Sequence, residues 1–429
     1  QIHSCRNLFL FSVFLFIVKI FLSVSPLSQI RNFINKLERI AGSKKILIFG
    51  LILIGLGLSW IKISQYLSFN IHPDISYYDY ALSNTLKGDF LLNWERKFFA
   101  GHFSPLVLLL LPFYLIHSGP VTLLVLQASA VCFSLVFLYK LSQHFLANSG
   151  VSLLITLGYL GSLYLMRGFY FDFHIEIFAP FLIFATFYYL VKQNELQYFI
   201  FLILFLAVKE DCGVYAVGLG LFIFFIIKNR KIGLATVILS LLWLFLALQI
   251  LKSYNPDLEN YLFVFRWDKY GNSFWSIVVG MLSHPFWVLQ DFFRFSFFKL
   301  FFYFLFIPLF FPQTYWLYLL PLVVNLTSNE PQQFSFGIHY ALPVIPFIYI
   351  AFILSLRKLS ARMFFFREKL LYAIALLFFV FNFGHFRIFD INSHHKLGQK
   401  IISQIPPEVS VAAQVDLLSH IPVRKKVYM

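Results

Sequence analysis

The sequence predicts an all-α polytopic membrane protein with about 10–12 transmembrane helices. Of its residues, 60% are hydrophobic and only 12% are charged, whereas soluble domains carry about 25% charged residues. Apolar runs of about 17–25 residues recur along the chain, and this is the length that a helix needs to cross a bilayer. The sequence lacks the short alternating segments that are typical of a membrane β-barrel.

The apolar runs give the expected order of helices. The first run, residues 8–24, could be a spanning helix or an uncleaved anchor. A basic amphipathic segment at 31–45 follows it, and the next long apolar run begins there. Further crossings are expected at about 120–140, 151–166, 175–192, 197–208, 212–227 and 232–251.

Three parts are expected in the chain. Residues 1–44 hold the N-terminal apolar and basic segments, and residues 45–384 form a transmembrane domain whose first external loop is 65–104. Residues 385–429 change character and read as a helix, a Pro-Pro turn, a strand "VSVAAQ", a short helix and the start of another strand. We therefore expect a small extracytoplasmic α/β tail, truncated at Met429.

The net charge is +15. Because Lys and Arg cluster between apolar runs, we interpret this charge as setting the orientation of the chain in the membrane and not as a nucleic-acid-binding surface. The positive-inside rule places residues 31–45, 228–231 and 356–369 in the cytoplasm. The segments around Asp74, His102, 172–176, 209–211 and His339 then face the outside of what we expect to be a prokaryotic plasma membrane. The three cysteines, at positions 5, 132 and 212, have no disulfide or metal-site spacing.

The segment that begins at Asp74 is predicted to be a helix lying flat on the membrane. Pro73 precedes it and Gly88 ends it. Asp74 lies in the first turn, where the helix dipole keeps a carboxylate ionised. Asp79 lies about 140° away around the helix, on a polar face with Ser76, Ser83 and Lys87, opposite an apolar stripe of Ile75, Tyr78, Leu82 and Leu86. Asp74 could instead be only an N-cap, and Asp79 only a charge on a solvated face.

Other ionisable residues lie against apolar helix ends, where charges are costly and point to function. The residues with metal-ligand chemistry are His102, Asp172, His174 and Glu176. They leave the metal requirement open, and a divalent cation is compatible with them. Arg167, Arg266 and Lys269 are candidate anion ligands. The alternatives are structural ion pairs, such as Lys209 with Asp211, buried hydrogen-bonded histidines, and headgroup anchors.

The order of several motifs resembles the predicted membrane-protein family called domain of unknown function 2079. The motifs are "PDISYYDYAL", "GHFSP", "FDFHIE", "KEDCGVY", "WDKYGNSFWSI" with "HPFWVL", "GIHYALPVIPF" and the tail "IPPEVSVAAQVDLLSHIPVRK", spanning about residues 45–429. The chain departs from the family's first motif with Ser76 in place of Gly and Tyr80 in place of Gln. The residues that match as they stand are Asp74, Asp79, His102, Asp172, His174, Lys209, Glu210 and His339.

That family is similar in layout to GT-C glycosyltransferases, which move a sugar from a polyprenyl-phosphate to an acceptor at the outer membrane face. The resemblance implies an acid in the first external loop as the catalytic base, and Asp74 matches that position. It implies a polyprenyl-phosphate-linked sugar and membrane lipid as partners. The expected catalytic residues are Asp74, Asp79 and His102, and the expected substrate-binding residues are Asp172, His174, Lys209, Glu210, Arg266 and His339.

Two other functions remain open. A transporter or flippase of a lipid-linked or anionic solute would use the same charges as a permeation site, with polar residues in both membrane halves. A non-catalytic scaffold would show polar clusters that satisfy one another far from any cavity. Asp79→Asn is expected to lower stability or donor affinity, unlike a substitution at Asp74.

Overall fold

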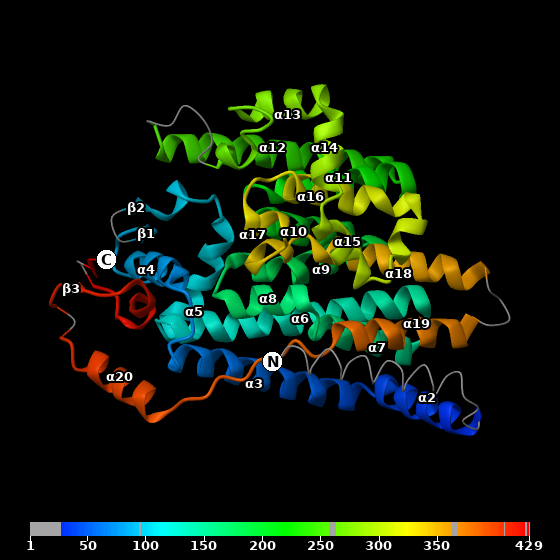
Figure 1. Ribbon diagram of the computed structural model, residues 1–429, viewed down its shortest axis with the longest axis horizontal. Coiled ribbons are helices and arrows are strands. Elements are labelled where there is room, and N and C mark those ends of the chain that lie inside the picture. Colours follow the sequence, from blue (N-terminus) through cyan, green and yellow to red (C-terminus); the bar gives the residue numbers. More distant parts are fainter. Residues whose placement is uncertain are drawn as a thin grey trace.

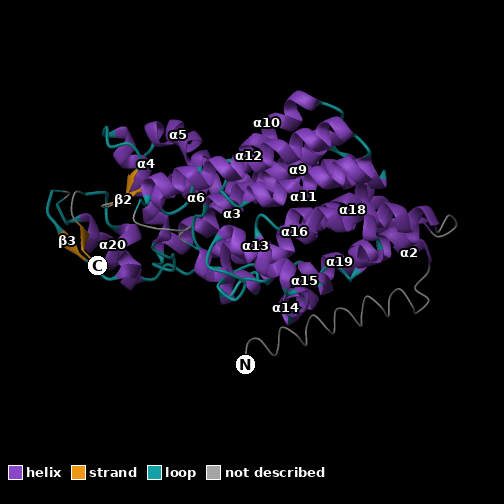
Figure 2. Cartoon of the chain, turned by 90° about the horizontal axis from the view of Figure 1, so that it is seen from above, coloured by secondary structure: helices purple, strands orange, loops and turns teal. Residues whose placement is uncertain are grey.

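The computed structural model describes residues 27–93, 96–256, 263–362, 367–406, 408–424 and 427–428. The expected apolar segment at 8–24 lies outside these residues. The described chain is predominantly helical, as the composition predicts, with two sheets of two strands each (Figures 1 and 2). All backbone groups of a helix other than those at its ends pair within the segment, which is what a bilayer interior requires.

The first half of the chain alternates long helices with short ones. Its α-helices are α2 (Leu27–Gly42), α3 (Lys44–Leu67), α4 (Asp74–Leu86), α5 (Leu111–Ile116), α6 (Pro120–Leu146), α7 (Ser149–Leu160), α8 (Leu163–Phe171), α9 (Ala179–Val191), α10 (Glu195–Leu206) and α11 (Cys212–Phe222). A hairpin of β1 (Leu92–Asn93) and β2 (Arg96–Lys97) follows α4, and the 3-10 turn η3 (Ile175–Phe178) leads into α9.

The second half contains more broken helices. They are α12 (Arg230–Tyr254), α13 (Phe274–Ser283), α14 (Pro285–Phe292), α15 (Phe295–Phe302), α16 (Tyr315–Leu326), α17 (Pro331–Phe334), the 3-10 turn η8 (Ile338–Ala341), α18 (Ile345–Arg362), α19 (Arg367–Asn382) and α20 (Ser393–Ser403). In the tail, β3 (Val411–Ala412) and β4 (Val427–Tyr428) pair in parallel across the 3-10 turn η10 (Val415–His420).

Three described helices are long and apolar enough to cross a bilayer, namely α3, α6 and α12. Two bent pairs also pass this test, α7 with α8 at 41° and residues 331–341 with 345–361 at 77°, which gives up to five spans. Other apolar helices, α9, α10 and α11 among them, are shorter. The helices thus support a membrane protein, and the expected number of about 10–12 spans stays a prediction.

Short polar signals set several helix ends. The side chain of Ser43 accepts a hydrogen bond from the Ile46 amide at the start of α3, and Asn148 and Asn229 cap α7 and α12 in the same way. Such caps satisfy amides that a helix leaves unpaired in its first turn. The break between α7 and α8 falls at Gly161, where an added Cβ would lie 2.8 Å from the Phe383 Cα.

One close approach brings two distant segments together near the end of α8. A Cβ on Gly168 would lie 2.7 Å from Cγ of Leu342, the residue after η8, so a larger residue would displace the Leu342 side chain from this close contact between α8 and η8. The turn that follows α8 carries Asp172 and His174, while η8 carries His339. Packing at Gly168 therefore positions the histidines that meet in the candidate site.

The helix α4, the β1–β2 hairpin and the tail gather at one end of the long helices, while α2 lies at the other (Figure 1). The tail docks on α3 through His420, whose ring stacks on Tyr66 at 4.2 Å. At this end of the molecule, η10 packs against α4. Ser76, Asp79 and Ser83 are buried, so the alternative that Asp79 is a solvated charge is wrong. That α4 lies flat on the membrane stays a prediction.

Candidate functional site

The start of α4 is held by a carboxylate from a distant segment. Pro73, which precedes the helix, offers no side-chain acceptor to the first amides. Asp172 supplies one, because its Oδ2 accepts a hydrogen bond from the Ile75 amide at 2.7 Å. Its Oδ1 accepts another from the Phe173 amide at 2.7 Å, and the side chain is fully buried. Asp172 thus satisfies one unpaired helix amide and fixes where α4 begins.

Asp74 lies in the first turn of α4 with its side chain 42% exposed. Nε2 of His174 is 3.2 Å from its Oδ2, and Nδ1 of His72 is 3.2 Å from its Oδ1. Burial alone would raise the pKa of Asp74, but the hydrogen bonds from His174 and His72 outweigh it and hold the pKa well below its usual range. At neutral pH the site therefore presents an ionised, accessible carboxylate between two imidazoles.

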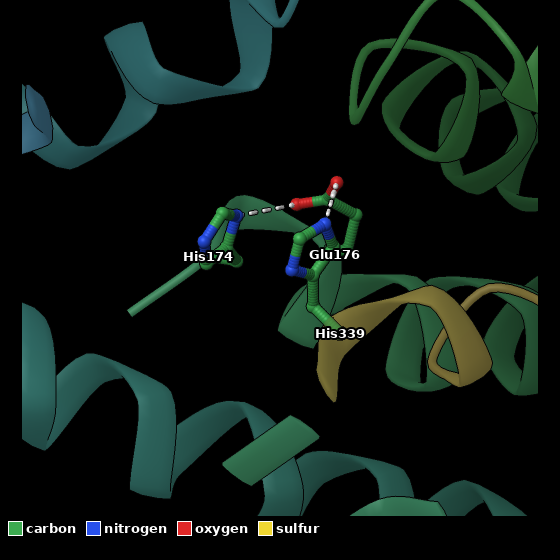
Figure 3. Close-up of side chains that lie close together, drawn as sticks. All are labelled: His174, Glu176 and His339. Atoms are coloured by element: carbon green, nitrogen blue, oxygen red, sulfur yellow. Dashed lines mark ion pairs between the residues drawn. The ribbon is translucent and has the colours of Figure 1, made fainter. Parts of the chain in front are cut away.

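Beside Asp74, three side chains point toward one another: His174, Glu176 and His339 (Figure 3). We call them the histidine–glutamate cluster. Nδ1 of His174 lies 3.7 Å from Glu176 Oε2, and Nε2 of His339 lies 3.7 Å from Glu176 Oε1. The two imidazole rings stack with centroids 3.8 Å apart and planes inclined by 13°.

Lys209 completes the surroundings of Glu176. Its Nζ donates a hydrogen bond to Glu176 Oε1 at 2.9 Å, and both side chains are buried. Burial would lower the pKa of Lys209, but the nearby carboxylates of Glu176, Asp211 and Glu210 raise it above its ordinary value. The ammonium group is thus committed to this buried pair. Lys209 therefore holds Glu176 in place. Its expected role in binding a substrate phosphate stays a prediction.

His174 connects Asp74 with the cluster. Burial would lower the pKa of its imidazole, but the hydrogen bond to Asp74 and the negative charge of Glu176 raise it to about 9. At neutral pH the ring therefore carries a positive charge and donates from Nε2 to Asp74, while Nδ1 faces Glu176.

Polar side chains of α3 and α6 bind the backbone of the segment where α8 ends. The fully buried Lys62 donates hydrogen bonds from Nζ to the Phe169 carbonyl at 2.8 Å and to Gln65 Oε1 at 2.9 Å. Gln127 donates to the carbonyls of Phe169 and Asp172. Backbone carbonyls freed where α8 ends need such donors inside a bilayer. These side chains hold the bend that presents Asp172 and His174.

A second pair lies on the neighbouring loops. Nδ1 of His102 is 2.8 Å from Glu210 Oε1, and the Phe103 amide donates to Glu210 Oε2 at 3.0 Å. The His102 ring stacks on Phe263 at 4.5 Å. Because Glu210 follows Lys209 in the chain, this pair adjoins the histidine–glutamate cluster.

Arg266 reaches the same region through aromatic rings. Its guanidinium lies 4.4 Å from the ring centroid of Phe263 and 5.5 Å from that of Tyr340. The group donates to Gln333 Oε1 at 3.4 Å. Arg266 therefore stands between the residues that neighbour His102 and His339, where a cation could meet a bound anion.

Asp79 lies apart from these residues. Its side chain is buried and accepts a hydrogen bond from Tyr114 Oη at 2.9 Å. It lines a separate cavity of about 420 Å³ with Ser83, Lys87 and residues 421–423 of the tail. Of the nine residues expected from the sequence, the structure brings the other eight together, and it directs Asp79 to the opposite side of α4.

A cavity of about 800 Å³ adjoins the site, and we call it the cationic cavity. Its basic lining residues are Arg167 of α8, Lys299 of α15, and His385 and Arg387 from the segment before α20. The lining contains no carboxylate, and among the described residues Arg167, Lys299 and Arg387 form no ion pair. Phe171 lines the cavity on one side, and on the other its ring lies 5.4 Å from that of His174.

Burial lowers the pKa of Lys299, and the charge of Arg167 lowers it further. Like charges gathered in one cavity repel one another, so a bound anion would relieve the repulsion. The cavity therefore has the electrostatics of an anion site.

Sequence comparison matches residues 74–429 to the family of predicted membrane proteins DUF2079. The chain belongs to this family. The match begins at Asp74 itself, whereas the sequence motifs led us to expect a start near residue 45. A search of curated proteins finds no match to the chain. The DUF2079 region contains Asp74, the histidine–glutamate cluster and the lining of the cationic cavity, whereas Lys62 lies in the helix before it.

Several site residues of this DUF2079 protein escaped sequence reasoning. Lys62 could have been found, because a lysine inside a long apolar run is costly and so points to a buried partner. Lys299 carries the same signal, since it interrupts an apolar run in α15. Arg387 carries none, because it lies in an irregular segment where a basic residue is ordinary. Only the approach of α8, α15 and the segment before α20 shows that their charges share one cavity.

Proposed function

We propose that this DUF2079 protein transfers a sugar from a polyprenyl-phosphate-linked donor to an acceptor at the extracytoplasmic membrane face. The observation that carries the proposal is the pairing of Asp74 with the cationic cavity across Phe171. An accessible, ionised carboxylate lies on one side of that ring, and a cavity lined by cations lies on the other. A base and an anion site this close are what group transfer from a phosphate requires.

The chemistry assigns a role to each part. Asp74 takes the proton of the acceptor hydroxyl, and the acceptor oxygen forms a bond to the anomeric carbon of the sugar. The bond between that carbon and the phosphate oxygen breaks, and the lipid phosphate leaves with the electron pair. Arg167, Lys299 and Arg387 stabilise the negative charge that develops on the phosphate. The imidazoles of His72 and His174 hold the Asp74 carboxylate toward the acceptor.

The lipid part of the donor has an apolar surface to follow. Phe295 lines the cationic cavity and is 80% exposed. On the neighbouring helices α13 and α14, Trp275 and Phe286 are 74% and 81% exposed. Exposed aromatic side chains of this density mark contact with lipid or a partner. A prenyl chain could therefore lie along α13–α15 while its phosphate enters the cavity.

The polar groups gather at one end of the long helices, which favours a one-sided active site over a permeation path. In the described chain, the ion pairs around Asp74, Glu176 and Glu210 adjoin one another, and α4, which begins at Asp74, lies at one end of the long helices (Figure 1). The proposal includes a location in the plasma membrane of a prokaryote, a GT-C-like arrangement of about 10–12 spans, and α4 on the side opposite the basic clusters.

Donor binding tests the proposal. The protein in lipid nanodiscs is titrated with a polyprenyl-phosphate, and binding is compared between wild type and Arg167→Met/Arg387→Met. Each charge-assisted contact to a phosphate contributes about 1.5–3 kcal/mol, so the double variant is expected to bind at least about 100-fold more weakly. The matched control is Arg357→Met/Lys358→Met, which removes two cations from a cavity of about 560 Å³ formed by other helices.

Two results would overturn the proposal. One is unchanged binding by the Arg167→Met/Arg387→Met variant together with weaker binding by the control. The other is tight donor binding by wild type, with no sugar product in reconstituted membranes supplied with acceptor lipids, but with movement of the donor between leaflets. The second result would assign the protein to the flippases.

A further inference from the structure

We propose that the histidine–glutamate cluster is a binding site for one divalent transition metal, with zinc as the metal its donors fit best. The ligands would be Nδ1 of His174, a carboxylate oxygen of Glu176 and Nε2 of His339. This assignment rests on the cluster's own geometry and holds whether or not the protein transfers a sugar.

The spacing of the donor atoms suits a metal. One ligand atom from each residue lies within 4.8 Å of the others. Both imidazole nitrogens are 3.7 Å from an oxygen of Glu176, too far for hydrogen bonds. Around a tetrahedral zinc with bonds of about 2.0–2.2 Å, neighbouring ligand atoms are about 3.4 Å apart. Each histidine nitrogen therefore has to move about 0.3 Å closer to Glu176. Because the two rings stack nearly parallel, one of them also has to turn so that both nitrogens face the metal.

The donor types select the metal class. Two imidazoles and one carboxylate are the ligands of many catalytic zinc sites, and imidazole nitrogen is a poor ligand for magnesium or calcium. Three protein ligands also leave a coordination position for water or a substrate oxygen. The cluster therefore favours zinc over the alkaline-earth ions.

Two further contacts have the form of supporting interactions around a metal. The imidazole of His174 turns its second nitrogen, Nε2, to Asp74 Oδ2 at 3.2 Å. A carboxylate that accepts from the outer nitrogen of a ligating histidine fixes the tautomer and strengthens the ligand. Lys209 holds Glu176 Oε1 at 2.9 Å in the same way. Zinc would replace the proton on Nδ1 of His174, and Nε2 would keep its proton for Asp74.

An unpartnered polar atom points to a missing ligand. Oε2 of Glu176 is buried and has no hydrogen-bond partner in the described chain, although its residue is only 3% exposed. Leaving an ionised carboxylate oxygen unpaired in the interior is costly. Nδ1 of His339, the ring nitrogen that is not among the proposed ligands, is also buried without a hydrogen-bond partner in the described chain. A metal bound by Glu176 and the two histidines would satisfy Oε2 of Glu176.

Metal content tests the site. Full-length protein is purified in detergent, stripped with a chelator, titrated with Zn²⁺ and desalted, and zinc is then counted by mass spectrometry. Wild type is expected to retain one zinc per chain. His339→Gln and Glu176→Gln should lose it, and Asp74→Asn should weaken the affinity about 10–100-fold through loss of the outer contact. The matched control, His102→Gln, removes a neighbouring histidine that pairs with Glu210 and should keep zinc.

X-ray absorption of zinc-loaded wild type keeps the test independent of how the variants fold. The spectrum is expected to show zinc bound by two imidazole nitrogens and by oxygen ligands. Sulfur ligation would overturn the proposal and point to the cysteines. Failure of wild type to retain zinc, or retention by correctly folded His339→Gln with unchanged affinity, would also overturn it. Neither outcome depends on sugar transfer, so failure of the metal site is distinguishable from failure of the proposed function.

Discussion

Two cavities of this protein differ in what surrounds their charges. The cationic cavity, about 800 Å³, adjoins carboxylates and imidazoles that pair with one another below the protein surface. The cavity of about 560 Å³ lies among Phe145, Phe187 and Leu190, and its basic residues are Arg357 and Lys358. Lys358 forms no ion pair in the described chain, and Arg357 lies over the ring of Phe145.

The comparison of the two cavities distinguishes two roles of charged residues in a membrane protein. Basic residues at the cytoplasmic ends of helices orient the chain and need no partner, because water and headgroups solvate them. Buried charges need partners, and an arrangement of them is kept only where it contributes something that apolar packing cannot. If this distinction holds, substitutions near Asp74 and Glu176 have large effects, and substitutions at Arg357 and Lys358 have small ones.

The largest effect is all-or-none and concerns sidedness. If the active site is one-sided, α4 and the basic turn at residues 228–231 lie on opposite sides of the membrane. In a cysteine-free background, Asp89→Cys and Lys231→Cys place single thiols at exposed positions. A membrane-impermeant maleimide added to intact cells should label the first and spare the second. Labelling of both from outside, with a cytoplasmic marker protein unlabelled, would contradict a one-sided active site.

The next prediction removes the proposed base. Asp74→Asn should lower sugar transfer about 10²–10⁴-fold, which is typical for loss of a general base. Asn keeps the size of the side chain, so folding and donor binding should change little. The measurement is transfer from a polyprenyl-phosphate-linked sugar in reconstituted membranes. Lys358→Met serves as control and should keep wild-type turnover. Near wild-type turnover by Asp74→Asn would exclude this residue from the mechanism.

A third prediction compares buried and exposed charge directly. Lys209→Met leaves the buried Glu176 carboxylate without its ion-pair partner and should destabilise the fold by about 3–5 kcal/mol. Lys358→Met should change stability by less than about 0.5 kcal/mol. Unfolding in detergent at neutral pH measures both. The double variant Lys209→Met/Glu176→Gln should recover part of the loss, and no recovery would mean that packing, not charge, explains the effect.

The smallest effect concerns Asp79 and pH. Burial raises the pKa of Asp79 to about 6, against smaller lowering effects from Tyr114, Lys87 and Ser83. The folded state therefore binds the proton more tightly than the unfolded state, whose carboxyl has a pKa near 3.9. Protonated Asp79 therefore makes its full contribution to the free energy of unfolding below about pH 4, and this contribution is lost as the pH rises through 6.

Asp79→Asn mimics the protonated side chain and can still accept from Tyr114. At pH 8 it should be more stable than wild type by about 1–3 kcal/mol, and near pH 4 the two should coincide. Thermal unfolding of both proteins across this range measures the difference. This reverses the loss of stability that the sequence led us to expect. A variant that is less stable than wild type at pH 8 would show that the carboxylate has a stabilising partner there.

The class of the protein and the places where chemistry could occur follow from the amino-acid sequence alone. Apolar composition requires a helical fold in lipid, because only helices pair their own backbone there. Ionisable residues at helix ends stood out against that background, and this is why Asp74, His102, Asp172, His174 and Lys209 could be singled out. The helix from Asp74 to Leu86 was also predicted closely from Pro73 and Gly88.

Which of these residues meet depends on how distant segments pack. His174 lies 100 positions from Asp74 in the chain, and helical periodicity states which residues share a face but not which segment packs against it. The covering of Asp79 by the tail, the contact of η8 with Gly168 and the sharing of one cavity by Arg167, Lys299 and Arg387 depend on such long-range packing. Those contacts arise from side-chain fit between distant segments, which no local pattern records.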